Sequence, residues 1–263
     1  MIGMEKIELI TNLTIASGYL QGERPLNLML LAMGGSGKSD LLEGYASFPG
    51  VLYTAYTSFA QLLKRHGDKI VSGDVRHIIV PDFAVSVGRS KDISSGELAA
   101  LGVLIEEGII RYETTRITFQ AATGRRVGMI IGLTNRTLLE LRQIAPPGFI
   151  GRFLRVSYSF SPETKQHVLE SIANQAYRHN TRHSTMRLSQ KVIKGDAEIF
   201  KRLSQQVSRI KDDGDAWGFR TQKHLQTIML ANALCNGRSQ VDTTDLETLA
   251  QLAPYLNEEY RPI

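Results

Sequence analysis

Eight consecutive residues constrain this chain more than any other part of its sequence. Residues 32–39 read Ala-Met-Gly-Gly-Ser-Gly-Lys-Ser, the P-loop pattern with alanine in place of the first glycine, and an apolar run at residues 28–31 precedes them. A strand, a glycine-rich turn and a helix start let backbone N–H groups surround phosphate oxygens, and the helix dipole adds attraction. The octet therefore predicts a nucleotide phosphate site, with a chance glycine turn as the less favoured alternative.

Several residues of this predicted site have an expected role. Lys38 would reach the β- and γ-phosphates of ATP, and the Ser39 hydroxyl would bind Mg²⁺. The apolar strand expected at residues 76–82 ends in Asp82, which we interpret as the acid that orders the Mg²⁺ shell. The alternative is an acid that only caps the next turn. The predicted nucleotide-binding set from the motif is Gly34, Gly35, Ser36, Gly37, Lys38, Ser39 and Asp40.

Composition excludes some classes of protein. The 263 residues are 42% hydrophobic and 22% charged, as in ordinary globular proteins. No apolar run approaches the roughly 20 residues that span a bilayer, and the first residues lack a signal-peptide pattern. A single cysteine, Cys235, excludes an intrachain disulfide. We therefore expect a cytoplasmic protein without a membrane partner. The net charge of +5 suits either nucleic acid or nucleotide phosphates.

The order of the expected elements predicts the fold class. Apolar strands at residues 28–31, 51–56, 76–82, 127–133 and 154–160 alternate with helices, which predicts a three-layer α/β domain with a parallel sheet over residues 1–160. From residue 161 the pattern is helical only. Ser161 is the expected N-cap and Pro162 the first helical residue. Residues 161–263 are therefore predicted to form an all-helical lid domain.

Residues 109–129 predict strand pieces joined by a hairpin. Its tip is expected to carry Arg125 and Arg126. Two arginines at such a tip suit contact with DNA phosphates. A solvated turn is the equally weighted alternative.

The order of the motifs resembles that of the AAA+ ATPases. In addition to the P-loop and Asp82, a strand ends in Thr134-Asn135, the triplet at residues 151–153 precedes another strand, and Gly-Phe-Arg at residues 218–220 opens a helix. The resemblance implies that Thr134 or Asn135 is sensor 1, which positions the attacking water. It implies that Arg152 is the arginine finger for the γ-phosphate of a neighbouring subunit, and that Arg220 is the sensor 2 arginine.

Two longer segments refine the resemblance. Residues 105–136 look like the stretch before sensor 1 in the minichromosome maintenance helicases and the bacterial enhancer-binding activators, and residues 219–249 are similar to the end of the minichromosome maintenance ATPase core. The resemblance implies ATP and Mg²⁺ as cofactors and a homo-oligomer, either a ring or a filament. It implies action on DNA as a helicase, a loader or a nucleoprotein-assembly regulator, with a replication or transposition protein as a candidate partner.

One departure from the family pattern affects the expected chemistry. Phe83 stands where the family usually has the glutamate that activates water. Downstream acids include Asp92, Glu97 and Glu106, and nothing in the sequence brings any of them to the γ-phosphate. A protein-remodelling AAA+ chaperone and a non-hydrolysing, ATP-dependent scaffold therefore remain alternatives. Arg136 and Arg155 remain alternatives for the arginine finger.

Overall fold

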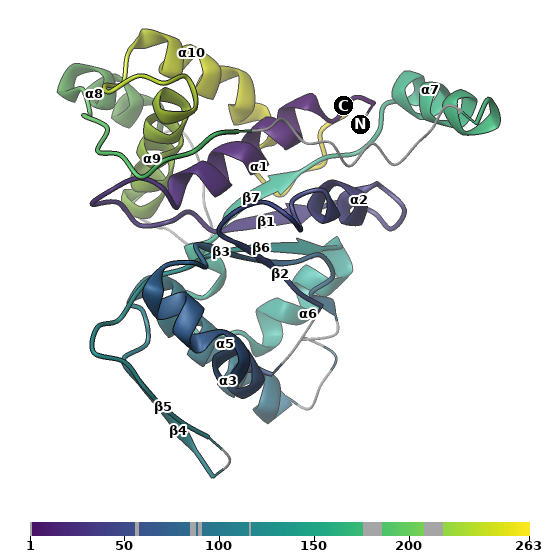
Figure 1. Ribbon diagram of the computed structural model, residues 1–263. Coiled ribbons are helices and arrows are strands. Elements are labelled where there is room, and N and C mark those ends of the chain that lie inside the picture. Colours follow the sequence, from purple (N-terminus) through teal and green to yellow (C-terminus); the bar gives the residue numbers. More distant parts are fainter. Residues whose placement is uncertain are drawn as a thin grey trace.

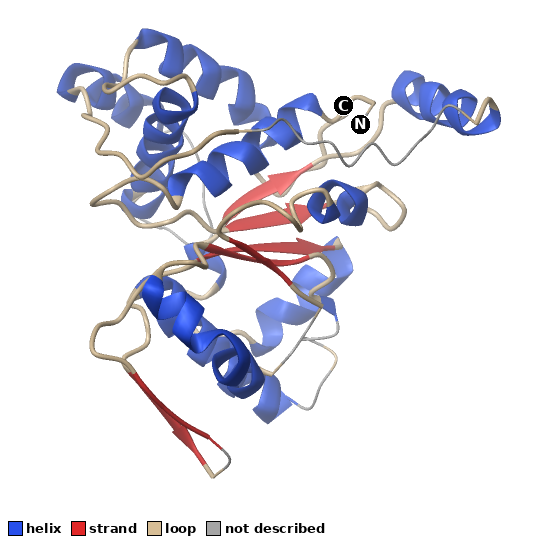
Figure 2. Cartoon of the chain, viewed as in Figure 1, coloured by secondary structure: helices blue, strands red, loops and turns tan. Residues whose placement is uncertain are grey.

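A parallel sheet forms the centre of the molecule. The computed structural model describes residues 2–55, 58–84, 88, 91–115, 117–175, 186–207 and 218–263. In it, five strands lie side by side in the order β2-β3-β6-β1-β7, and all are parallel (Figures 1 and 2). The strands are β1 (Leu28–Leu31), β2 (Val51–Tyr53), β3 (His77–Val80), β6 (Gly128–Leu133) and β7 (Leu154–Ser157). The predicted α/β class with a parallel sheet is thus confirmed.

Side chains of strand β1 alternate between two hydrophobic cores. Leu28 and Leu30 belong to the first core, whereas Met29 and Leu31 belong to the second. Successive residues of a strand point to opposite faces, and both faces of a parallel sheet are covered. This explains why β1 is apolar at every position rather than at every second one.

The first core joins the N-terminal helix to the C-terminal helices. Helix α1 packs against α9, and α8 and α10 pack around α9 on the same face of the sheet (Figure 1). The helices of this face are α1 (Glu5–Ser17), α2 (Lys38–Glu43), α8 (Ala197–Val207), α9 (Phe219–Cys235) and α10 (Thr243–Leu252), followed by the short turn η2 (Ala253–Tyr255). Residues after 160 therefore share a hydrophobic core with α1 and the sheet. The domain boundary at residue 160 stays a prediction.

The second core is covered by three helices on the opposite face (Figure 1). They are α3 (Phe59–Ser72), α5 (Lys91–Glu106) and α6 (Asn135–Ile144), and the short turn η1 (Ile150–Arg152) leads into β7. Two helix starts differ from the sequence prediction. Helix α5 begins at Lys91 instead of near residue 95, because its polar first residues form a helical turn rather than a loop. Helix α6 begins at Asn135 instead of Leu138, because Thr134 caps it.

Two elements extend away from the body in Figure 1. Strands β4 (Arg111–Thr114) and β5 (Ile117–Gln120) form an antiparallel hairpin whose Phe119 packs against α3. Helix α7 (Pro162–Ala173) has no buried residue. Its predicted start is confirmed, since Ser161 is the N-cap and accepts a hydrogen bond from Thr164 N–H. The expected helix ends near residues 177 and 210 lie outside the described residues.

None of the helices in the described part of the chain is both long enough and apolar enough to cross a membrane.

Candidate functional site

The P-loop, residues 32–39, curves around an open cleft. Gly35 and Gly37 have φ angles of 74° and 77°, which glycine adopts without the strain that a side chain brings. A Cβ atom built on Gly34 or Gly35 would meet nothing within 4 Å. The backbone therefore faces a cleft of about 290 Å³, close to the lower limit for small-molecule pockets.

The carboxyl ends of three neighbouring strands line this cleft. The P-loop follows β1, Asp82 follows β3 and Thr134 follows β6. The lining residues are Gly34, Gly35, Ser36, Gly37, Lys38, Ser39, Asp40, Pro81, Asp82, Gly132, Leu133 and Thr134. All of the nucleotide-binding residues predicted from the sequence are thus on the wall of one cleft.

Lys38 lies against the P-loop itself. Its Nζ atom donates hydrogen bonds to the carbonyl oxygens of Ala32, at 2.6 Å, and Met33, at 2.9 Å. Burial lowers the pKa of Lys38, and the Asp82 carboxylate opposes that shift. An ammonium group held at the mouth of a glycine-rich loop is suited to pairing with phosphate oxygens.

A buried tyrosine forms a hydrogen bond to the backbone of the P-loop. Tyr158, directly after β7, is fully buried and its hydroxyl donates a hydrogen bond of 3.2 Å to the carbonyl oxygen of Ser36. Burial raises the pKa of Tyr158, so the hydroxyl keeps its proton and acts as a donor. Tyr158 therefore connects the last strand of the sheet to the centre of the loop.

Asp82 lies on the wall of the cleft and also caps the turn that follows β3. One oxygen, Oδ1, accepts a hydrogen bond of 3.0 Å from Ala84 N–H, the turn-capping contact. The side chain is exposed to the cleft and close enough to Lys38 to influence its pKa. Phe83, in contrast, is 1% exposed and packs in the second core. The position after Asp82 therefore contributes no polar group to the cleft.

The two sensor 1 candidates differ in their surroundings. Thr134 lines the cleft, but its hydroxyl accepts a hydrogen bond of 3.2 Å from Thr137 N–H as the N-cap of α6. Asn135 is the first residue of that helix, is exposed, and is not on the cleft wall. Of the two, Thr134 is the one beside the P-loop.

A magnesium ion bound with a nucleotide would suit the cleft. Ser39 and Asp82 are both on its wall. No group of three or more His, Cys, Asp or Glu side chains among the described residues is arranged to hold a metal ion alone. Mg²⁺ commonly uses one or two protein ligands together with substrate phosphates, so this small donor set fits that ion.

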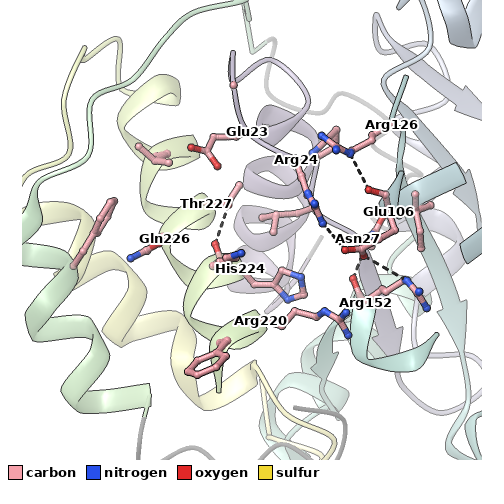
Figure 3. A pocket seen from close by; sticks show the side chains of 18 residues that line it. Glu23, Arg24, Asn27, Glu106, Arg126, Arg152, Arg220, His224, Gln226 and Thr227 are labelled. Carbon is pink, nitrogen blue, oxygen red and sulfur yellow. Dashed lines mark hydrogen bonds and ion pairs between the residues drawn. The ribbon is translucent and has the colours of Figure 1, made fainter. Parts of the chain in front are cut away.

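A second, larger cleft lies at the amino ends of the strands. Its volume is about 840 Å³, and Arg152 and Arg220 both line it (Figure 3). The other basic side chains on its wall are Arg24, Arg126, Lys223 and His224, and the acidic ones are Glu23 and Glu106. We call this the cationic cleft.

Asn27 and Glu106 connect the separate segments that line the cationic cleft. Buried Asn27 donates to the carbonyl oxygen of Arg152 at 3.1 Å and accepts from Met129 N–H at 2.9 Å, which joins the starts of β7 and β6. The Glu106 carboxylate forms an ion pair with Arg24, and its Oε2 lies 3.4 Å from Arg152 Nε (Figure 3). Asn27 thereby fixes the backbone of the predicted finger, and Glu106 lies beside its side chain.

The two clefts are on opposite ends of the sheet. Strands β1 and β7 pair in parallel from Leu28 with Leu154 to Leu31 with Ser157. The P-loop follows the last of these pairs, and Arg152 precedes the first. Four residues of strand, at about 3.3 Å each, separate the two ends. Arg152 and Arg220 therefore line a cleft at the end of the sheet opposite the P-loop of their own chain.

The location expected for Arg125 and Arg126 was wrong. In the register of the hairpin, Thr114 lies opposite Ile117, so the two strands meet at these residues and not near residue 125. Arg126 instead returns to the body, where its Nε donates 2.8 Å to the carbonyl oxygen of Glu106 in the cationic cleft. The alternating pattern indicated two strands but not their register, so the tip was misplaced. Their contact with DNA stays a prediction.

Sequence reasoning missed several site residues. Tyr158 and Arg24 were not considered, and Glu106 was named only as an acid of unknown location. Arg24 and Glu106 are 82 positions apart in sequence. No local sequence pattern predicts such a pair. A predicted strand order with β6 and β7 on either side of β1 would, however, have indicated that the segments before these three strands lie close together.

Comparisons with known proteins add no family to these observations. No protein-family model matches this chain, and no curated protein matches it either.

Proposed function

We propose that this chain is an ATPase of the AAA+ type that assembles head to tail and acts on DNA. The observation that carries the proposal is the pair of complementary clefts. One has a glycine-rich loop with Lys38, Ser39 and Asp82 on its wall, and the other contains Arg152 and Arg220 at the far end of the same sheet.

Head-to-tail assembly follows from this separation. A phosphate tail bound at the P-loop cannot meet Arg152 of the same chain, because the sheet lies between them. It can meet the cationic cleft of a second copy. Contacts of this kind, between two different surfaces, generate rings when they close and filaments when they do not.

Hydrolysis in such an assembly would depend on position and charge. Lys38 and the loop backbone would hold the phosphates, and Arg152 of the adjacent copy would stabilise negative charge on the transferred phosphoryl group. Arg220 shares the cleft with Arg152, which favours action of both arginines on the neighbouring nucleotide. Mg²⁺, when bound through Ser39 and Asp82, supplies additional charge neutralisation.

Steady-state release of phosphate from ATP tests the enzymatic part of the proposal. We expect turnover by the wild-type protein that is lost in Lys38→Ala, together with loss of ATP binding in calorimetry. Electron microscopy with an ATP analogue should show rings or filaments. A protein that stays monomeric with ATP and Mg²⁺ would contradict the proposal.

Buried Phe83 favours one other function, the non-hydrolysing scaffold. Phe83 offers no base for water, so a nucleotide would then bind and drive assembly without turnover. ATP-dependent oligomers that release no phosphate above the Lys38→Ala background would support this second function.

The DNA part of the proposal has its own test. The net charge of +5 and the resemblance favour it. Fluorescence anisotropy with labelled single- and double-stranded DNA at low salt, with ATP, should show binding that weakens as salt rises, since released counterions drive such binding. Equal anisotropy with and without protein would exclude DNA while leaving the ATPase proposal intact.

A further inference from the structure

The P-loop cleft contains few carboxylates that are able to accept a proton from water. Among the described residues that line it, only Asp40 and Asp82 carry a carboxylate. Asp82 is the predicted metal acid and already accepts from Ala84 N–H. Asp40 follows Ser39 in the first turn of α2, beside the loop rather than across the cleft from it. Phe83 is apolar and buried.

The downstream acids differ in where the fold puts them. Glu97, on α5, accepts a hydrogen bond from Phe59 N–H at the start of α3, and it lines neither cleft. The side chain of Asp92 lies outside the described residues. Glu106 is the one of the three that lies in the cationic cleft.

Glu106 is adjacent to the predicted finger. Its carboxylate is about one quarter exposed, with Arg24 on one side and Arg152 Nε at 3.4 Å on the other. Arg152 Nε is buried and has no hydrogen-bond partner within the described structure, so the guanidinium is not locked by this ion pair. Its Nη1 atom lies beside Gly102 and Gly148, where the lack of a side chain leaves the guanidinium uncrowded.

We propose that Glu106 is the general base for ATP hydrolysis and that it acts in trans, on the nucleotide bound by the adjacent copy. This inference rests on the proposed head-to-tail ATPase. One cleft then delivers both catalytic groups: Arg152, at the end of η1, pairs with the γ-phosphate, and Glu106, at the end of α5, receives the proton of the attacking water. The apolar residue at position 83 leaves the base to be supplied by the neighbouring chain.

The step balances in atoms and charge. The water oxygen forms a bond to the γ-phosphorus, and the bond between that phosphorus and the β,γ-bridging oxygen breaks. The bridging oxygen keeps the electron pair and leaves with ADP. The proton of the water passes to a Glu106 carboxylate oxygen and is later released to solvent, so the products are ADP, inorganic phosphate and one proton.

The geometry suits this role because a general base acts within hydrogen-bond reach of its proton, directly or through one water. The Glu106 carboxylate lies beside Nε, at the edge of the Arg152 guanidinium. When the terminal nitrogens pair with the phosphate, a water at this edge is within reach of the carboxylate. Arg24 holds the carboxylate there, and the Arg126 hydrogen bond to Glu106 O fixes the backbone.

The first test compares Glu106→Gln with Glu107→Gln. Glutamine keeps the size of Glu106 and an oxygen for Arg24 but accepts no proton. We expect kcat to fall about 10²–10⁴-fold in Glu106→Gln, with ATP affinity and oligomer size unchanged. Glu107 is adjacent, exposed and absent from both clefts, so its variant should keep wild-type kcat.

The second test asks whether the base acts in trans. Glu106→Gln has an intact P-loop, and Lys38→Ala has an intact Glu106, so a mixed oligomer contains interfaces with one of each. We expect the mixture to regain phosphate release that neither variant shows alone. If Lys38→Ala does not enter mixed oligomers, Asp82→Asn replaces it in the same experiment.

The outcomes separate this inference from the proposed function. If the wild-type protein releases no phosphate, the ATPase proposal itself fails. If the wild type turns over and Glu106→Gln keeps its kcat, Glu106 is not the base. Mixed oligomers that remain inactive would overturn action in trans, because a base acting on its own chain cannot be complemented.

Discussion

The two ends of the sheet are built from different kinds of chemical group. At the carboxyl ends, the P-loop presents backbone around a cleft of about 290 Å³, and Lys38 is the only cation among the described residues on its wall. At the amino ends, side chains of separate segments surround about 840 Å³ and are mainly cationic. The first arrangement suits holding a phosphate chain, and the second suits stabilising charge that develops on it. In the proposed assembly neither end forms a complete site alone.

The largest expected effect is that of Arg152→Ala, which should separate the binding of ATP from the stabilisation of charge during its hydrolysis. Arg152→Ala should lower kcat about 10³–10⁵-fold, because an arginine finger contributes on that scale. ATP affinity should change little, since Arg152 is remote from the P-loop of its own chain. Single-turnover assays and calorimetry on the same preparation check both parts.

The matched control for this variant is Arg136→Ala. Arg136 was an alternative finger, and its side chain is 90% exposed in a pair with Glu140. Wild-type kcat is expected for it. A large loss in Arg136→Ala, with normal turnover by Arg152→Ala, would assign the finger to the carboxyl end instead.

The second effect concerns a histidine buried at the amino end. His77 is fully buried with Nε2 3.2 Å from Leu26 O, and burial lowers its pKa from 6.5 to about 4. The unfolded chain therefore binds the extra proton more readily than the folded one. Stability should be fully present above pH 6.5 and decrease as the pH falls toward 4, by up to about 1.4 kcal/mol per pH unit.

Urea unfolding at pH 7.5 and pH 5 measures this dependence. His77→Asn, which does not titrate in that range, should be less stable at pH 7.5 but show a flatter dependence. His167→Asn on the exposed helix α7 should keep the wild-type slope. Equal slopes for all three proteins would show that another group controls acid stability.

A third, smaller effect tests how tightly the carboxyl ends are packed. A Cβ atom on Gly132 would lie 2.1 Å from the carbonyl oxygen of Pro81. Gly132→Ala should therefore push β6 from β3 and cost about 1–3 kcal/mol, measured by urea unfolding. Gly34→Ala adds the same methyl group where nothing lies within 4 Å, so its stability should match the wild type.

The smallest effect concerns the tyrosine behind the P-loop. Tyr158→Phe removes the hydrogen bond to Ser36 O, which is worth about 1 kcal/mol, so ATP should bind up to about five-fold more weakly. Tyr45→Phe removes a comparable buried bond, to Asn12 Oδ1 at 2.7 Å, away from the clefts. It should affect stability but not ATP affinity. Equal ATP affinity in both variants would separate Tyr158 from the nucleotide site.

The same contrast explains what the sequence was able to predict. The P-loop, the five strands and the Ser161 cap depend on neighbouring residues, and their patterns are visible in short segments. The cationic cleft depends on contacts between distant segments, such as Arg24 with Glu106, which no periodicity encodes. The hairpin is an intermediate case. Its strands were predicted, but their register, which decides where Arg125 and Arg126 lie, depends on pairing.

The hydrophobic core that α1 shares with the C-terminal helices limits how far these helices can move when a nucleotide binds at the P-loop. Ile10 and Leu13 of α1 are fully buried in one cluster with Ile228 and Leu230 of α9. Pulling these helices apart would expose several side chains at about 1.5–3 kcal/mol each. A hinged swing of α8–α10 away from the sheet is thus disfavoured, whereas α7 has no buried residue and is held to the body by fewer contacts. Hydrogen exchange should then be slow in α9 and fast in α7, whichever nucleotide is present.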